Sequence, residues 1–201
     1  TANTDKFHTR LKKTKNDYEI QVDDFLIKNS ACEKLLGIKI DSKLSFDEHV
    51  TDLCNKASQK LHALIRVSRY MNLHQRRTIM KSFINSQFGY CPLVWIFTSR
   101  AINHRINRIH ERSLRIVYQD QDSSFEELLI RDNSVTIHIR NLQSLAIELY
   151  KVVNNISPEL MKKILPVIED KRYPTPSIFE TRNVHTTKFG IESLAHLGPQ
   201  I

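Results

Sequence analysis

Residues 45–65, SFDEHVTDLCNKASQKLHALI, decide the fold class of this 201-residue chain. Their apolar side chains recur at steps of three and four positions, which places them on one face of an α-helix. The apolar positions of this stretch are Val50, Leu53, Cys54, Ala57, Leu61, Leu64 and Ile65. Ser45 and Glu48 have the spacing of a capping box, so we predict that the helix is capped at Ser45. From this point on the chain is expected to be mainly helical.

The residues before this helix show the pattern of β-strands. Residues 18–22 and 25–28 alternate apolar and polar around the acidic pair Asp23 and Asp24, which predicts a β-hairpin. Residues 34–40 (KLLGIKI) predict a third strand. The expected fold is therefore mainly α with a small N-terminal β portion.

Two further helices are predicted to complete a three-helix bundle. Asn72 and Gln75 have capping-box spacing, and Ser99 is a candidate N-cap for the helix that follows. The inward residues predicted for the two helices are Ile79, Met80, Phe83, Ile84 and Phe88, and then Ile102, Ile106, Ile109, Ile116 and Val117. The apolar segment between them, residues 90–97, is expected to place Trp95 and Phe97 in the core.

Helical signals continue toward the C-terminus and predict two or three additional helices. Ser124 and Glu127 predict a capping box, residues 136–154 predict a long amphipathic helix, and Ser157 before Pro158 predicts a last N-cap. Residues 169–182 are expected to form a linker, and residues 184–201 extended segments. The domain regions expected along the chain are 1–45, 46–120, 121–168 and 169–201.

Positive charge is concentrated in the middle of the sequence. The net charge is +8, and residues 46–120 carry twelve Lys and Arg against five Asp and Glu. Arg105, Arg108, Arg112 and Arg115 recur at steps of three, four and three, which places them along one helix face. The residues predicted to extend this surface are Lys56, Lys60, Arg66, Arg69, Arg76, Arg77 and Lys81. Residues 53–119 hold a single acid, Glu111, so the pattern predicts binding to a nucleic-acid backbone.

The alternative interpretation of the arginines is a solvated helix face, in which arginine stems cover apolar neighbours. For Tyr70, Tyr90 and Trp95 we favour packing in the core over stacking on nucleic-acid bases.

Several classes of site are not supported by the sequence. Cys32, Cys54 and Cys91 are too widely spaced for a CxxC motif or a disulfide framework, and the nine histidines lack zinc-ligand spacing. Four glycines leave no phosphate-cradling loop. No run of eighteen apolar residues is present and the first ten residues are polar, so we expect no membrane partner and an intracellular location, nucleus or cytoplasm.

Five blocks of sequence, taken in order, carry a resemblance to a known family. The blocks are LLGIKIDSKLSFDEH (35–49), GYCPLVW (89–95), INRIHERSLRIVY (106–118), SSFEELL (123–129) and SVTIHIRNLQSLAIELYKV (134–152). Together they resemble the C-terminal part of the reverse transcriptases of non-LTR retrotransposons, of the LINE type and jockey-like. The resemblance covers nearly the whole chain.

The resemblance implies a role for each part of the sequence. Residues 3–8 (NTDKFH) look like a late palm motif, and residues 35–40 look like the strand that leads from palm to thumb. Residues 46–118 would be the helical thumb, which in such polymerases grips the template–primer duplex. Both ends, including the final LGPQI, look like truncations of a longer polymerase.

The resemblance also implies that catalysis lies outside this chain. Such polymerases hold two Mg²⁺ ions on carboxylates of separate palm motifs. The family's Phe/Tyr-Ala-Asp-Asp box is absent, and we interpret Asp23 and Asp24 as turn residues of the hairpin. No polymerase activity, no catalytic residue, no metal site and no cofactor are therefore expected in the fragment.

Three hypotheses for function remain. The first is a thumb module that binds RNA–DNA hybrid and acts with the palm and fingers of the same polymerase. The second is an independently folded helical module that binds DNA or RNA. The third is a degenerate transposon-derived protein without function.

Overall fold

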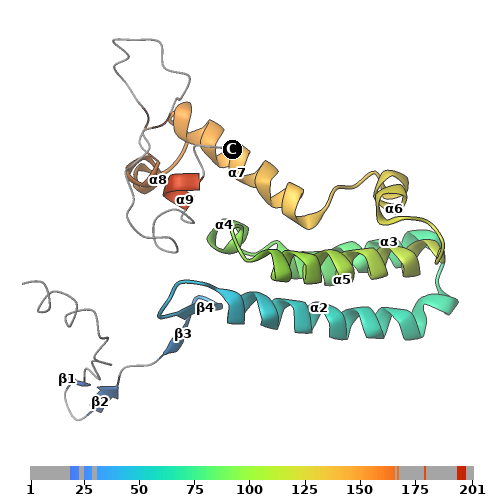
Figure 1. Ribbon diagram of the computed structural model, residues 1–201, viewed down its shortest axis with the longest axis horizontal. Helices are drawn as coiled ribbons and strands as arrows, with labels where there is room; N and C mark the ends of the chain where they lie inside the picture. The colour runs from blue at the N-terminus through green and yellow to red at the C-terminus, as the bar shows by residue number, and fades with distance from the viewer. Residues whose placement is uncertain are drawn as a thin grey trace, which may run out of the picture. The chain divides into compact units, whose positions relative to one another are not determined.

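The computed structural model describes residues 19–22, 25–28, 31–165, 167, 179 and 194–197 (Figure 1). The chain divides into two compact units, residues 1–33 and 34–201. Its described part is mainly helical with a small N-terminal β portion, which confirms the predicted fold class. Among the described residues, no helix combines the length and the apolarity that a membrane span requires.

The first unit contains the hairpin that the sequence predicts. Strand β1 (Glu19–Val22) pairs antiparallel with β2 (Phe25–Lys28), with Glu19 opposite Lys28 and Val22 opposite Phe25. Asp23 and Asp24 lie outside the described residues, so their interpretation as turn residues stays a prediction.

The single strand predicted over residues 34–40 is wrong. Two short strands, β3 (Cys32–Leu35) and β4 (Ile38–Asp41), pair with each other around a turn at Leu36 and Gly37. These two residues have φ values of 47° and 89°, the pair of positive angles that a tight two-residue hairpin requires. The strand prediction includes Leu36, yet this residue lies in the turn and is 83% exposed.

The long helix predicted from the opening stretch is present as α2 (Asp47–Val67), and its predicted apolar face forms part of the core. The capping box predicted at Ser45 is not formed, because the N-cap is Phe46 with a positive φ of 57°. Asp41 holds this turn instead. Its Oδ1 accepts from the Phe46 N–H at 2.8 Å, and its Oδ2 accepts from the Ser45 hydroxyl at 3.0 Å.

The second helical segment of the bundle is irregular. After the short 3₁₀ turn η2 (Ser68–Tyr70), it comprises α3, the π-helical turn η3 and the 3₁₀ turn η4, with bounds Leu73–Ile79, Met80–Ile84 and Asn85–Phe88. The capping box at Asn72 and Gln75 is confirmed, with backbone-to-side-chain bonds of 3.0 and 2.9 Å.

The π-helical turn changes which residues of this segment face the core. Met80, Ile84 and Phe88 follow at steps of four and are fully buried. The prediction that Phe83 faces inward is wrong, since its side chain is 56% exposed. A π turn holds more residues than an α turn. Residues four positions apart, such as Met80 and Ile84, therefore lie on the same face, whereas Phe83, three positions after Met80, does not.

The apolar segment and the third helix follow the prediction closely. Helix α4 (Pro92–Trp95) buries Trp95, and Ile96 beside it is 1% exposed, whereas Phe97 is only half-buried. Helix α5 (Arg100–Tyr118) is capped by Ser99, whose Oγ accepts from the Ile102 N–H at 3.4 Å. Helices α2, α3 to η4, and α5 share one hydrophobic core, which forms the predicted three-helix bundle.

Arg76 of α3 is a charged side chain inside this bundle. It is 8% exposed. Its Nε donates to the carbonyl oxygen of Val117 at 2.9 Å, and its Nη1 donates to those of Met71 at 2.9 Å and Ser68 at 3.4 Å. Val117 lies in the last turn of α5, while Ser68 and Met71 lie in the connection after α2, so Arg76 joins the end of α5 to that connection.

Replacing Arg76 with methionine is expected to lower the free energy of unfolding by about 2 kcal/mol, because three carbonyl groups lose a charged donor. Chemical denaturation followed by circular dichroism measures the change. The exposed neighbour Arg69→Met is the matched control and should stay within about 0.5 kcal/mol of the parent protein. Equal stability of the two variants would contradict the structural role of Arg76.

Three further helices follow the bundle, with bounds Phe125–Asp132 for α6, Ile137–Val153 for α7 and Glu159–Ile164 for α8. The capping box at Ser124 and Glu127 is confirmed, with bonds of 2.7 and 3.3 Å. The N-cap predicted at Ser157 is wrong. Pro158 occupies that position, and Ser157 is buried with no hydrogen-bond partner for its hydroxyl among the described residues.

The described part of the C-terminal region contains two elements. Val167 and Phe179 form an isolated β-bridge, and Phe179 packs with Val152 and Leu165 in a small second cluster. Residues Leu194–Leu197 form the short helix α9, where the sequence predicted an extended segment. The predicted linker otherwise lies largely outside the described residues.

Candidate nucleic-acid interface

Three of the four arginines predicted to line one face of α5 are exposed. Arg105, Arg108 and Arg112 follow at steps of three and four, which places them on successive turns. Within the described ranges no carboxylate pairs with any of them, and Arg105 donates through Nη2 to the neutral Oδ1 of Asn55 on α2 at 2.6 Å. These three side chains are called the α5 arginine face below.

Arg115 does not share this environment. Its Nε and Nη2 donate to Oε1 of Glu111 at 3.2 and 2.8 Å, and its Nη1 donates to the carbonyl oxygen of Gln121 at 2.6 Å. The pair with Glu111 spans one helical turn, and the Arg115 side chain is 21% exposed. Glu111 therefore balances the charge of Arg115, and Arg115 is not counted as part of the α5 arginine face.

Helix α2 extends the α5 arginine face. Arg105 contacts Asn55, and residues seven and eleven positions later on a helix lie on nearly the same side. Those positions are His62 and Arg66, both exposed. Arg66 belongs to the predicted surface, whereas His62 was missed, although its helical spacing from Asn55 is readable in the sequence.

Lys56 and Lys60 lie on another side of α2. The Nζ of Lys60 stands 6.0 Å from the centroid of the Phe83 ring, on the π-helical turn η3. Lys56 is one helical turn before Lys60 and is exposed. The structure therefore brings these two lysines toward the second helical segment and not to the α5 arginine face.

The three basic residues predicted on the second helical segment are largely engaged within the protein. Arg76 is buried, as described above. Arg77 pairs through Nε with Oδ1 of Asp132 at 2.6 Å, and the Nζ of Lys81 lies 3.9 Å from Oδ2 of the same carboxylate. The hydrogen bond that Arg77 donates to the Asp132 carboxylate raises the pKa of Arg77 further above its usual value. A surface that includes all eleven predicted cations is therefore not formed.

The aromatic residues differ from one another in exposure. Trp95 is buried, as predicted. Tyr70 is 77% exposed, so the prediction that it packs in the core is wrong, and the guanidinium of Arg69 lies 4.9 Å from its ring centroid. The same prediction is wrong for Tyr90, which is 51% exposed and whose hydroxyl donates to the carbonyl oxygen of Leu36 at 2.7 Å.

The α5 arginine face has the properties of a phosphate-binding surface. Its guanidinium groups follow one another over about 10 Å of helix, at about 1.5 Å of rise per residue. Guanidinium groups bind phosphate oxygens in a bidentate manner and carry no information about base identity. Among the residues that the structure describes, no group of three or more His, Cys, Asp or Glu side chains is placed to hold a metal ion.

Comparisons of the chain with protein-family models, with curated proteins and with solved structures find no match.

Proposed function

We propose that this chain is the thumb region of a non-LTR retrotransposon reverse transcriptase and that it grips the backbone of an RNA–DNA hybrid. The observation that carries the proposal is the α5 arginine face. Its side chains are exposed without carboxylate partners in the described residues, while Arg76, Arg77 and Arg115 are engaged within the protein. Binding through phosphates follows the shape of the duplex and discriminates little between bases.

The sequence resemblance supplies the catalytic context of this proposal. The carboxylates and the Mg²⁺ ions of such a polymerase belong to its palm, and this chain contributes binding without chemistry of its own. RNA–DNA hybrid and the palm and fingers of the same polymerase are the proposed partners. An intracellular location, in nucleus or cytoplasm, belongs to the same proposal.

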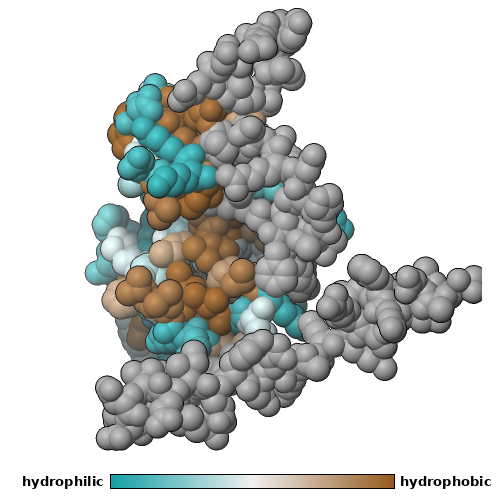
Figure 2. Space-filling view, turned by 90° about the vertical axis from the view of Figure 1, so that its left-hand side faces the viewer, coloured by the Kyte–Doolittle hydropathy of each residue, from teal (hydrophilic) through white to brown (hydrophobic). Residues whose placement is uncertain are grey.

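An independently folded nucleic-acid-binding module is the second candidate. Exposed apolar side chains favour the thumb proposal over this candidate, because large exposed apolar patches mark surfaces that dock on another domain or protein. Leu36 is 83%, Tyr90 51% and Val94 43% exposed, and the Tyr90 hydroxyl joins the β3–β4 turn to the segment before α4. Figure 2, which looks at the end of the bundle that carries α4 and β4, shows hydrophobic residues gathered on its surface.

Replacing Arg105, Arg108 and Arg112 together with alanine is expected to weaken hybrid binding roughly 100-fold at 50 mM salt, because up to three phosphate contacts are lost. The slope of log affinity against log salt concentration should fall by about one for each arginine removed. Fluorescence anisotropy with hybrid, DNA duplex and single strands at several salt concentrations measures both quantities.

The matched control removes the same number of charges from α7 and α8, by replacing Lys151, Lys162 and Lys163 with alanine. This variant should keep most of the affinity and the salt slope of the parent protein. Equal losses in the two variants would show that net charge, and not the α5 arginine face, determines binding. Absence of salt-dependent binding to any nucleic acid would reject the proposal and leave a degenerate transposon-derived protein.

A further inference from the structure

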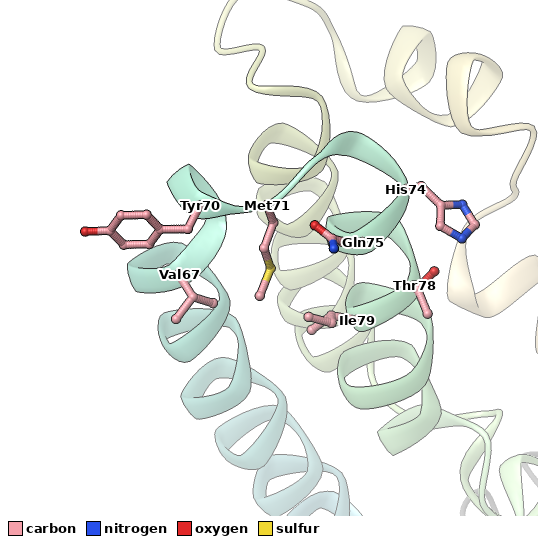
Figure 3. A pocket seen from close by; sticks show the side chains of 7 residues that line it. All are labelled: Val67, Tyr70, Met71, His74, Gln75, Thr78 and Ile79. Carbon is pink, nitrogen blue, oxygen red and sulfur yellow. The ribbon is translucent and has the colours of Figure 1, made fainter.

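A groove of about 580 Å³ opens between the end of α2 and the start of α3. Its volume falls within the range of small-ligand sites. The residues that line it are Val67, Tyr70, Met71, His74, Gln75, Thr78 and Ile79. In Figure 3 Met71 and Ile79 lie between the two helices, while Tyr70 and His74 stand at opposite sides. The groove therefore has an apolar floor, and the rings of Tyr70 and His74 point outward at its two edges.

Tyr70 is placed to stack on a flat ligand. Its ring is 77% exposed, although burying an aromatic ring contributes strongly to stability. The guanidinium of Arg69 lies 4.9 Å from the ring centroid, which fixes a cation next to the aromatic plane. An exposed tyrosine with an adjacent arginine has the composition of a base-stacking platform.

Gln75 supplies a hydrogen-bond donor of fixed orientation inside the groove. Its Oε1 accepts from the Asn72 N–H at 3.0 Å in the capping box, which directs the amide oxygen toward the helix start. The Nε2 of the same amide makes no hydrogen bond within the described residues and remains able to donate to a carbonyl oxygen. A donor beside an apolar floor suits a nucleobase, which has a flat apolar face and polar edges.

The charge of the surrounding elements favours an anionic ligand. Residues 53–79, which include both helical walls of the groove, contain basic residues and no Asp or Glu. Arg66 belongs to the extended α5 arginine face, and Tyr70 follows it by four positions, one turn further along the chain. A strand held by the arginines can therefore reach the groove without crossing an acidic surface.

We propose that Tyr70 and this groove bind an unpaired nucleobase from a single-stranded segment that continues from a bound duplex. The inference deepens the proposed function, on which it rests for the position of the duplex. The phosphates of the strand lie toward Arg66 and Arg69. The base stacks on Tyr70 or enters the groove above Met71, where Gln75 donates to its polar edge.

The test compares a blunt RNA–DNA hybrid with the same hybrid carrying a five-nucleotide single-stranded extension. Fluorescence anisotropy is expected to show tighter binding of the extended hybrid by the parent protein. Tyr70→Ala should reduce the affinity gained from the extension about tenfold and leave binding of the blunt hybrid unchanged, because one stacking contact is lost. Tyr70→Phe should retain the gain.

Tyr150→Ala is the matched control, because Tyr150 is 64% exposed on α7 and does not line the groove. A second readout uses Tyr70→Trp, whose new indole should lose fluorescence when a single-stranded oligonucleotide binds. The native Trp95 is 3% exposed and should contribute little to that change.

The outcomes separate this inference from the proposed function. Loss of blunt-hybrid binding in the triple arginine variant, with the extension gain intact in Tyr70→Ala, overturns the inference and supports the α5 arginine face. Loss of the extension gain in Tyr70→Ala, with the triple arginine variant unaffected, supports the groove and rejects that face. The inference is also overturned if Tyr70→Ala lowers the affinity for the blunt and the extended hybrid equally. A change in the oligomeric state of Tyr70→Ala would overturn it as well.

Discussion

Replacing Asp132 with alanine is expected to lower the free energy of unfolding by about 3 kcal/mol. The Asp132 side chain is 1% exposed at the end of α6, and its Oδ1 accepts from Arg77 at 2.6 Å and from the Tyr118 hydroxyl at 3.0 Å. Its removal leaves these donors without their shared acceptor. This expected loss lies at the lower end of the range for breaking buried ion pairs, because the Arg77 side chain is 38% exposed and remains partly hydrated. Chemical denaturation measures it.

The control for this prediction is Asp122→Ala, which removes an exposed carboxylate two positions after Asp120 and should change stability by less than about 0.5 kcal/mol. The double variant Arg77→Met with Asp132→Leu should recover much of the loss, since apolar side chains replace both members of the pair. A single Asp132→Ala variant as stable as Asp122→Ala would contradict the role of Asp132 in joining α3, α5 and α6.

Local signals in the sequence predict the helix starts well where the cap is made by neighbouring residues. The capping boxes at Asn72 and Ser124 are both formed, because each needs only a side chain and a backbone N–H three positions away. Ser45 has the same spacing but donates its hydroxyl to Asp41, which comes from the preceding strand. The spacing of the capping-box motif does not reveal a competing hydrogen-bond partner, such as Asp41, that lies outside the motif.

Helical periodicity predicts the core only while the helix stays regular. It identifies the buried faces of α2 and α5, which are ordinary α-helices. It fails at Phe83, where a π-helical turn rotates the following residues relative to the regular pattern. The strand prediction over residues 34–40 fails for a different reason, because the apolar Leu36 occupies a tight turn.

The sequence predicts where the candidate site lies, but not which of the basic residues belong to it. Residue spacing places Arg105, Arg108 and Arg112 on one exposed face. Arg76 and Arg77 are neighbours in sequence, yet one caps backbone carbonyls and the other pairs with Asp132, fifty-five positions away. Such engagement depends on tertiary contacts, so a count of basic residues overestimates the surface that is available to nucleic acid.

His110 makes the stability of the bundle depend on pH. It is 2% exposed on α5, stands edge-on to the Phe125 ring at 5.7 Å, and has no hydrogen-bond partner for either nitrogen among the described residues. Burial, helped by the positive charge of Arg140 on α7 and opposed by Asp132, lowers the pKa of His110 to about 4. The folded protein therefore keeps this imidazole neutral at pH values where the unfolded chain protonates it.

Lowering the pH from 6.5 to 4 is expected to reduce the free energy of unfolding by about 3 kcal/mol through His110 alone. The sign follows from the pKa values, because the unfolded state, with a His pKa of 6.5, binds the proton first and is favoured as the pH falls. The contribution of neutral His110 to stability is present above pH 6.5. It is lost as the pH falls from 6.5 toward the pKa of about 4 in the folded protein. Denaturation curves recorded across this range measure the slope.

His110→Leu isolates this effect, because leucine fills the apolar site and does not titrate. The variant should match or exceed the parent stability at pH 7, since the imidazole nitrogens gain no hydrogen bonds from the described residues, and it should lose much less stability toward pH 4. Burial also lowers the pKa of His49, which adds a slope of the same sign in both proteins and cancels in their difference. Parallel pH profiles for the two proteins would show that His110 is protonated equally in the folded and unfolded states.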